Sequence, residues 1–399
     1  MTSSPRPFFV LIALVGGLAI FSSTLSKTPV LPLFAHALNA SPAEIGWIIM
    51  ASTLPGILIS YPAGALSDHL GARRLLLASL VVFASAPFLY LLIETPWQLM
   101  AVRFYHGFAT AIFGTVATAA IAERYVNDRA TRLSTYSSIT LVGRSSAPFL
   151  GGMLISLASF EAVYLTCAIS GVLALMAGLL LGDDTPAPTV KRARPRFWAS
   201  LATVLRDRGI MLVSLTEAAQ YLVFGAIEAF LALYASALGI PAWQIGVILG
   251  VQLVSIVFAK PLMGRISDRL GRRRVILPGL LLGAASVALL PLFPNFAGLF
   301  ALSLTFGIGF ATVTSSTTAL VADLTREGRY GSSMGVLRTV MDVGQSIGPV
   351  LTGWMVGVAG YGPAFVLLAA ILVAAALLLG LAFKEAKNAG THPARRDQI

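Results

Sequence analysis

The stretch that decides the fold is GALSDHLGARRLLL, residues 64–77, because a similar stretch, GRISDRLGRRRVIL, occupies residues 264–277. A second pair of similar stretches consists of GRSSAPFLGGML, which starts at Gly143, and GQSIGPVLTGWM, which starts at Gly344. The first pair is 200 residues apart and the second pair 201. A nearly constant offset predicts two consecutive halves with the same fold.

The composition indicates that both halves lie in a membrane. Of the 399 residues, 57% are hydrophobic and 11% are charged, whereas about 25% are charged in soluble domains. The mean hydropathy is +0.83. The single cysteine, Cys167, excludes a disulfide scaffold. One span takes about 20 apolar residues, so the chain is long enough for about a dozen spans with connectors.

Apolar runs bounded by charged residues, Pro or Gly predict twelve spanning helices. They lie at residues 8–35, 43–63, 75–93, 98–122, 133–158, 162–182, 210–237, 243–263, 275–293, 297–322, 331–357 and 361–383. The first is too long for the apolar core of a cleaved signal peptide, so we expect it to remain as a span. The expected fold class is an all-α integral membrane protein with two pseudo-symmetric six-helix bundles. The expected divisions are a first bundle at 1–182, a linker at 183–209, a second bundle at 210–383 and a tail at 384–399.

The basic residues predict the orientation of these spans. The chain has 28 Lys+Arg against 17 Asp+Glu, which gives a formal net charge of +11. All but five of the 28 lie in the two tails, the central linker and the even-numbered connectors. Cytoplasmic connectors are enriched in Lys and Arg, so we expect a multi-pass protein of the cell membrane with both termini in the cytoplasm. The same distribution favours the lipid bilayer as partner and disfavours nucleic acid.

The repeated loop stretch resembles the signature of the major facilitator superfamily, and the whole chain resembles its twelve-span drug/proton antiporters. The loop residues that carry this resemblance are Gly64, Asp68, Gly71 and Arg73, with Gly264, Asp268, Gly271 and Arg272 in the second copy. The span-five antiporter pattern is carried by Gly143, Pro148, Gly151 and Gly152, and its partial copy by Gly344, Gly348 and Pro349. Arg103 and Gly107 match the span-four pattern R-x-x-x-G.

The resemblance implies transport by alternating access and a conformational latch, formed by the two loop copies, that favours the outward-facing state. The glycines permit tight turns and close helix approach, and the charges complement helix dipoles. The chain departs from the family pattern at His69, Ala72 and Ala147. The first two departures replace basic residues of the family pattern, so the first loop has fewer hydrogen-bond donors. The second copy is therefore the stronger candidate for the latch.

Ionisable side chains within the spans are the candidates for the transport site, since a charge at the bilayer centre costs at least about 2.5 kcal/mol and usually faces a cavity or a partner. Lys260 lies near a span end and is expected to extend to the interface. The remaining candidates for the substrate and proton cavity are Lys27, Arg103, His106, Arg144, Glu217, Glu228, Arg338 and Asp342.

Spacing predicts three relations among these candidates. Lys27 and Glu228 are 201 residues apart, so they occupy equivalent positions in the two halves and are expected to pair or to exchange partners. Arg338 and Asp342 are four residues apart, share a helix face and can pair. Glu217 and Glu228 are eleven residues apart, about three helical turns, and are expected to face the same way.

Proton binding is expected at a carboxyl group, because a carboxyl in an apolar cavity takes up a proton more readily than one in water. Glu228 ranks ahead of Glu217 and Asp342, since no basic residue lies within one turn of it on its own helix. His106 is either a packing residue or a proton carrier. The four His residues lack metal-ligand spacing, and no phosphate loop or nucleophile motif is found. We therefore expect no metal, no cofactor and no enzyme activity.

These features favour a secondary transporter that is driven by the proton-motive force and works as a monomer. The resemblance implies efflux of a small amphipathic compound, while the excess of cations among the cavity candidates admits an anionic or zwitterionic solute. The alternative is a proton symporter or a uniporter that imports an organic anion. A membrane-embedded enzyme or a scaffold is a remote alternative.

Overall fold

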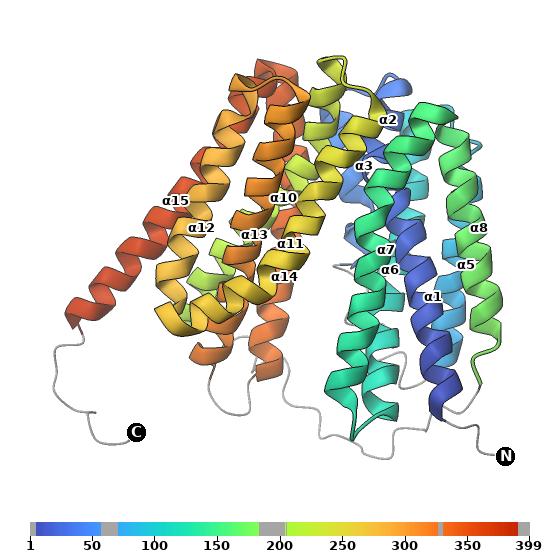
Figure 1. Cartoon of the computed structure of the whole chain (residues 1–399), viewed down its shortest axis with the longest axis horizontal. Coiled ribbons are helices and arrows are strands. Elements are labelled where there is room, and N and C mark those ends of the chain that lie inside the picture. The colour runs from blue at the N-terminus through green and yellow to red at the C-terminus, as the bar shows by residue number, and fades with distance from the viewer. Residues whose placement is uncertain (1–4, 57–70, 183–203, 205, 326–329, 390–399) are drawn as a thin grey trace.

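The computed structural model describes residues 5–56, 71–182, 204, 206–325 and 330–389, and all regular elements within these ranges are helical (Figure 1). The helices of the first half are α1 Pro5–Leu25, α2 Val30–Ala37, α3 Pro42–Ala51, α5 Ala72–Tyr90, α6 Pro96–Arg124, α7 Arg129–Leu157 and α8 Phe160–Leu179. Those of the second half are α10 Arg208–Ala237, α11 Ala242–Leu270, α12 Arg272–Leu289, the 3-10 helix η1 Leu290–Leu292, α13 Phe296–Leu324, α14 Tyr330–Ala359 and α15 Tyr361–Ala389.

Each of the twelve expected spans overlaps at least one of these helices, and the all-α membrane fold class is confirmed. In the described part of the chain, nine helical segments are long and apolar enough to cross a membrane. Most of the expected linker at 183–209 lies outside the described residues, and so do the expected latch residues Gly64 and Asp68.

The first expected span, 8–35, is not a single helix. It is divided into α1, which ends at Leu25, and α2, which begins at Val30. Pro29 lacks the N–H group that helix propagation needs, and a proline disfavours helical backbone at the residue before it. The equivalent helix of the second half, α10, runs without interruption from Arg208 to Ala237. The two halves therefore differ in backbone at this position.

Several helices begin at polar caps that satisfy their first N–H groups. Ser41 and Glu44 form a capping box at the start of α3, and Thr95 and Gln98 form another at the start of α6. The side chain of Asn295 accepts a hydrogen bond from Gly298 N at the start of α13. Helix starts are thus encoded locally, because each cap supplies the acceptor that the first turn lacks.

The helices of each half pack in the same pattern. In the first half, α1 packs on α7 and α8, α5 packs on α6 and α8, and α3 packs on α6. In the second half, α10 packs on α14 and α15, α12 packs on α13 and α15, and α11 packs on α13. Each of these contacts thus has its counterpart in the other half, and the fold is a pair of pseudo-symmetric bundles.

The halves meet mainly through two helix pairs, α7 with α11 and α3 with α14 (Figure 1). We call the end of the molecule where α1 begins and α15 ends the terminal side, and the opposite end the far side. The contacts between the halves lie toward the far side, where α3 and α11 begin and α7 and α14 end. Toward the terminal side the two bundles diverge (Figure 1).

Glycine allows the helices of these two pairs to approach backbone to backbone. A Cβ atom at Gly46 would lie 2.5 Å from Pro349 O, and one at Gly246 would collide with Pro148 O. These positions are 200 and 201 residues apart in the two halves, so the contacts repeat the symmetry. Two further glycines approach the opposite half in the same way. We call the set the far-side seal, and its members are Gly46, Pro148, Gly152, Gly246, Pro349 and Gly353.

Candidate functional site

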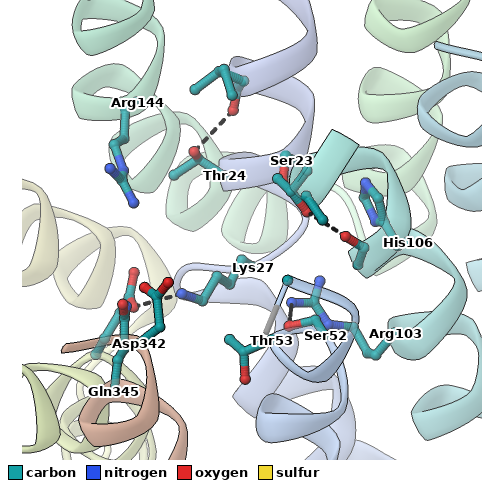
Figure 2. Close-up of a pocket in the computed structure, with 16 residues that line it drawn as sticks. Ser23, Thr24, Lys27, Ser52, Thr53, Arg103, His106, Arg144, Asp342 and Gln345 are labelled. Carbon is teal, nitrogen blue, oxygen red and sulfur yellow. Dashed lines mark hydrogen bonds and ion pairs between the residues drawn. The ribbon is translucent and has the colours of Figure 1, made fainter. Parts of the chain in front are cut away.

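A cavity of about 310 Å³ lies between the two halves (Figure 2). It is formed by α1, α6 and α7 of the first half with the residues that follow α3, and by α10 and α14 of the second half. Its polar and charged lining consists of Ser23, Thr24, Lys27, Ser52, Thr53, Arg103, His106, Thr110, Arg144, Glu228, Asp342 and Gln345. Six of the eight sequence-predicted cavity residues are therefore brought together, and Glu217 and Arg338 are not among them.

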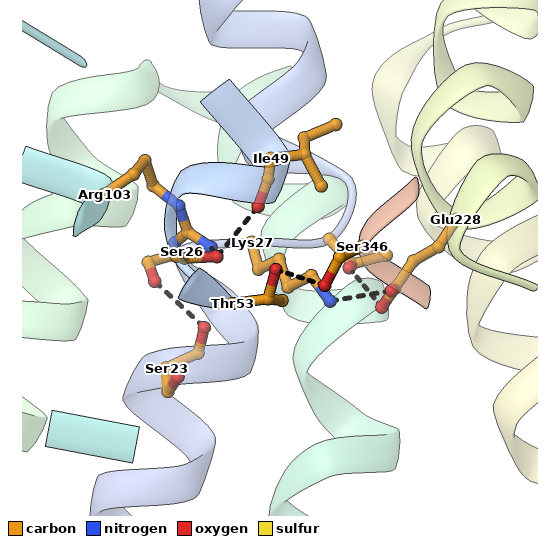
Figure 3. Close-up of polar contacts among 10 residues, drawn as sticks. Ser23, Ser26, Lys27, Ile49, Thr53, Arg103, Glu228 and Ser346 are labelled. Carbon is orange, nitrogen blue, oxygen red and sulfur yellow. Dashed lines mark hydrogen bonds and ion pairs between the residues drawn. The ribbon is translucent and has the colours of Figure 1, made fainter. Parts of the chain in front are cut away.

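Lys27 and Glu228 form an ion pair that joins the two halves (Figure 3). Lys27 lies in the break between α1 and α2, and its Nζ is 2.8 Å from Glu228 Oε2. The hydroxyl of Thr28 donates a hydrogen bond of 2.8 Å to the other carboxylate oxygen. The side chains of Lys27 and Glu228 are 24% and 11% exposed. Both carboxylate oxygens are thus occupied by partners from the opposite half.

A second polar contact between the halves lies beside this pair. The hydroxyls of Thr53 and Ser346 are 2.7 Å apart, one from the first half and one from α14 (Figure 3). Each hydroxyl also has a backbone acceptor in its own half, Met50 O for Thr53 and Asp342 O for Ser346, so either hydroxyl can donate in the contact between the halves. The Lys27–Glu228 pair is therefore one of at least two polar links near the far-side seal.

Arg103 is 4% exposed and has neutral partners in the described part of the chain. It donates to Ser52 Oγ at 2.8 Å and to Tyr90 Oη at 3.3 Å, while its Nε has no partner there. Tyr90 also contacts His106 Nδ1 at 3.3 Å and stacks on Tyr164 with 4.6 Å between ring centroids. The result is a buried cation in a network of hydroxyl groups and one imidazole, at the wall of the cavity.

Arg144 and Asp342 face the cavity from opposite halves (Figure 2). Arg144, on α7, is exposed, and Asp342, on α14, is half-buried. Neither side chain has a hydrogen bond or an ion pair with a residue that the structure describes. Arg338 shares a helix face with Asp342, but the two form no ion pair within 4.0 Å in the described structure. Their expected pairing is therefore not present.

The structure places Glu217 away from the cavity, contrary to the expectation from its spacing to Glu228. Glu217 is 3% exposed and accepts a 2.7 Å hydrogen bond from the hydroxyl of Thr317 on α13. It lies about 16 Å from Glu228 along α10, toward the terminal side, where α13 packs on that helix. Helical periodicity gives the direction of a side chain but not the neighbour that covers it at a given depth.

The second loop copy forms a charge cluster at the terminal side. Arg272 pairs with Asp268 of α11, and its Nε is 3.1 Å from Asp323 Oδ2 of α13. Gly71 and Gly271 both have positive φ, 85° and 92°, which glycine adopts without strain. The cluster links the ends of three helices within one half.

Arg73, in the first loop copy, has partners at the end of α8 among the described residues. It donates to the carbonyl oxygens of Leu181 and Leu179 at 2.6 and 3.2 Å. It thereby satisfies carbonyl groups at the end of α8. A Cβ atom at Gly264 would meet no heavy atom within 4 Å, so no close approach requires glycine there.

The glycines of the span-five pattern pack on several partners. A Cβ atom at Gly143 would lie 3.1 Å from Gly17 O on α1, and one at Gly151 would lie 3.1 Å from Val30 Cγ2 on α2. At Gly152 it would lie 2.9 Å from Gly246 Cα, across the far-side seal. In the partial copy, Gly344 and Gly348 pack on the backbone of α10.

Sequence reasoning from charges missed the uncharged members of the site. Thr28, Ser52, Tyr90 and Ser346 bind charged or polar groups of the cavity, and hydroxyl residues in otherwise apolar spans were the available signal. Gln345 is 201 residues from Arg144, so the repeat also pointed to it. Among the described residues, no group of three or more His, Cys, Asp and Glu side chains could hold a metal ion.

The family model that matches the chain is that of the Major Facilitator Superfamily, over residues 12–250 and 213–398. An uncharacterised MFS-type transporter of Methanocaldococcus jannaschii is 25% identical over 346 residues, which cover 83% of this chain and 87% of the relative. The staphyloferrin B transporter of Staphylococcus aureus is 26% identical over 336 residues, or 80% and 79% of the two chains. The multidrug resistance protein MdtG of Enterobacter lignolyticus is 30% identical over 174 residues, 42% of each chain.

Solved structures with the same fold include transporters of low sequence identity. A bacterial homologue of the human lysosomal transporter Spinster, in an inward-facing and unoccupied conformation, superposes with a TM-score of 0.82 at 17% identity. That match covers 98% of this chain and 100% of the homologue. A point variant of the nucleoside transporter NupG also has a TM-score of 0.82, at 14% identity over 94% and 100% of the two chains.

Proposed function

Because the chain belongs to the Major Facilitator Superfamily, a family of multi-pass membrane transporters for small molecules, we propose that it exports a small solute in exchange for protons by alternating access. The presence of a cavity between two similar bundles supports transport by alternating access. The likeness of part of the chain to a multidrug resistance protein favours export, and so does the antiporter pattern at the far-side seal.

In this proposal the terminal side faces the cytoplasm and the protein lies in the plasma membrane as a functional monomer. The basic connectors support this orientation, since Lys and Arg are enriched on the cytoplasmic side. The far-side seal is then the closed outer gate, and the divergence of the bundles at the terminal side corresponds to an inward-open form.

The observation that carries the coupling is the Lys27–Glu228 ion pair between the halves. A proton that binds Glu228 Oε2 neutralises the carboxylate and removes the charge that holds the Lys27 ammonium. A partly buried pair that loses one charge is strongly weakened, so proton binding weakens one link of the closed outer gate. The Glu228 carboxylate cannot be protonated and hold the Lys27 ammonium as an ionic partner at the same time, so proton binding is tied to the state of the outer gate.

The test is transport in proteoliposomes with an imposed pH gradient of either sign and a panel of small amphipathic, anionic and zwitterionic solutes. We expect export against the inward movement of protons, with a direction that follows the sign of the gradient. The Glu228→Gln variant should lose this dependence, while the control Glu94→Gln, at an exposed far-side position outside the cavity, should keep it.

Two outcomes would contradict this proposal. Flux that is unaffected by the gradient in the wild type would exclude proton coupling, and solute movement in the same direction as protons would favour the alternative, a symporter that imports an organic anion. The pair is tested by combining Lys27→Gln with Glu228→Gln. Non-additive losses are expected if the two side chains act together, and additive losses would show that they act separately.

A further inference from the structure

Two opposite charges in the cavity have no partner in the described protein. Lys27 and Glu228 neutralise each other at 2.8 Å, and Arg103 is buried in the wall with Ser52 and Tyr90 as acceptors. Arg144 and Asp342 remain, and both line the cavity without a hydrogen bond or ion pair to the described residues. The cavity therefore presents one available cation and one available anion.

Such charges need a partner when water is excluded from the cavity. An ionised group within the membrane is costly unless it faces water, a counter-charge or a ligand. The Arg144 guanidinium offers a planar fork of N–H donors that suits a carboxylate, phosphate or similar anion. The Asp342 carboxylate accepts hydrogen bonds and suits an ammonium group. Gln345, one turn further along α14, lines the same cavity and supplies an uncharged donor and acceptor.

The position of these two groups relates them to the movement of the halves. Arg144 precedes Pro148 by four residues and Asp342 precedes Pro349 by seven, so they lie about 6 and 10 Å on the terminal side of the seal along their helices. Arg144 belongs to the first half and Asp342 to the second. A solute held by both would bridge α7 and α14 directly below the contacts that close the far side.

We propose that the transported solute is a small zwitterion, bound with its anionic group at Arg144 and its cationic group at Asp342. This inference deepens the proposed function and rests on it. A cavity of about 310 Å³ corresponds to the liquid volume of about ten water molecules, which fits a small solute. A singly charged solute would leave one of the two protein charges without a partner, and this gives the site its selectivity.

The experiment measures ligand binding without a gradient. Purified protein in nanodiscs is titrated with a panel of α- and ω-amino acids, by calorimetry and by the shift in thermal unfolding. Each amino acid is compared with its N-acetyl derivative, which lacks the cation, and its methyl ester, which lacks the anion. The pH is kept slightly below neutral, where the amine and carboxyl groups of the probes are both charged.

In the wild type we expect at least one amino acid to bind about tenfold or more tightly than both derivatives, because a hydrogen bond to a charged group contributes that much. The Arg144→Gln variant should bind this amino acid no more tightly than it binds the methyl ester of the same amino acid. Asp342→Asn should bind it no more tightly than its N-acetyl derivative. The controls Arg274→Gln and Glu94→Gln, at exposed positions outside the cavity, should keep the wild-type preference.

Three results would overturn the inference. One is that no member of the panel binds, and another is that the derivatives bind as tightly as the parent amino acids. The third is an equal loss of affinity for all three probe types in both variants, which would indicate that Arg144 and Asp342 pair with each other when the halves close. Absence of zwitterion preference in the wild type together with intact proton-driven flux refutes this inference alone, whereas zwitterion binding by the wild type without gradient-dependent flux refutes the proton coupling alone.

Discussion

A methyl group added at Gly46 is expected to open the far side of the transporter. A Cβ atom there would lie 2.5 Å from Pro349 O and 2.9 Å from Val350 Cα, both of the opposite half. Ordinary van der Waals contact begins near 3.4 Å, so α3 and α14 must separate by nearly 1 Å. Overpacking of this kind costs about 1–3 kcal/mol. Because the cost falls only on the state with the seal closed, Gly46→Ala should shift the equilibrium toward far-side opening about 5- to 150-fold.

The assay is a distance measurement between nitroxide labels at the far side. Leu92 and Leu292 suit it, because they are 74% and 69% exposed and occupy equivalent places in the two halves. The chain has one cysteine, the buried Cys167, which is replaced by alanine first. The wild type should show one main distance, and Gly46→Ala should add a longer population.

The matched control is Gly357→Ala on α14. A Cβ atom at Gly357 would meet no heavy atom within 4 Å, so this substitution adds the same methyl group without a contact between the halves. Its distance distribution should equal that of the wild type. An unchanged distribution in a folded Gly46→Ala protein would show that close packing at the seal does not hold the conformation, and the reasoning would fail.

Two further predictions concern groups outside the cavity. Thr317→Val removes the hydroxyl that donates to Glu217 at 2.7 Å and should lower the free energy of unfolding by about 1–3 kcal/mol, measured as a lower Tm in detergent. Arg272→Gln removes the exposed pairs with Asp268 and Asp323, so stability should fall by no more than about 1 kcal/mol, while the rate of solute exchange in proteoliposomes falls if the cluster acts as a latch.

Each of these substitutions has a control of the same type. Thr318 lies beside Thr317 and donates within its own helix, to Thr314 O, so Thr318→Val should leave the Tm closer to that of the wild type. Arg274 is exposed on the same helix as Arg272, and Arg274→Gln should leave solute exchange unchanged. Equal effects of target and control would count against the specific contact in each case.

The sequence was sufficient to predict the architecture because hydropathy, charge and the repeat offset are global signals. The same offset related Lys27 to Glu228, and the structure contains that ion pair. Glu217 was placed in the cavity incorrectly, since its direction on α10 was visible in the sequence but the packing of α13 over it was not. The break before Val30 was missed for a related reason. The spans were predicted from runs of apolar residues, and such a run does not show that Pro29 removes one backbone N–H donor.

This break has a mechanical consequence for the way the halves move. α1 packs on α7 and α8 of its own half, whereas α2 has its most extensive contact with α10 of the other half. The segment from Val30 to Ala37 therefore contacts the second bundle through α10 as well as its own bundle through α3, α7 and α8. In the proposed rotation of the bundles, the four residues that join α1 to α2, which include Lys27, must accommodate any shift between α1 and the segment that contacts α10. Charge neutralisation at Glu228 would then release Lys27 within this four-residue connection, so that proton binding acts on the joint between α1 and α2 as well as on the contact between the halves.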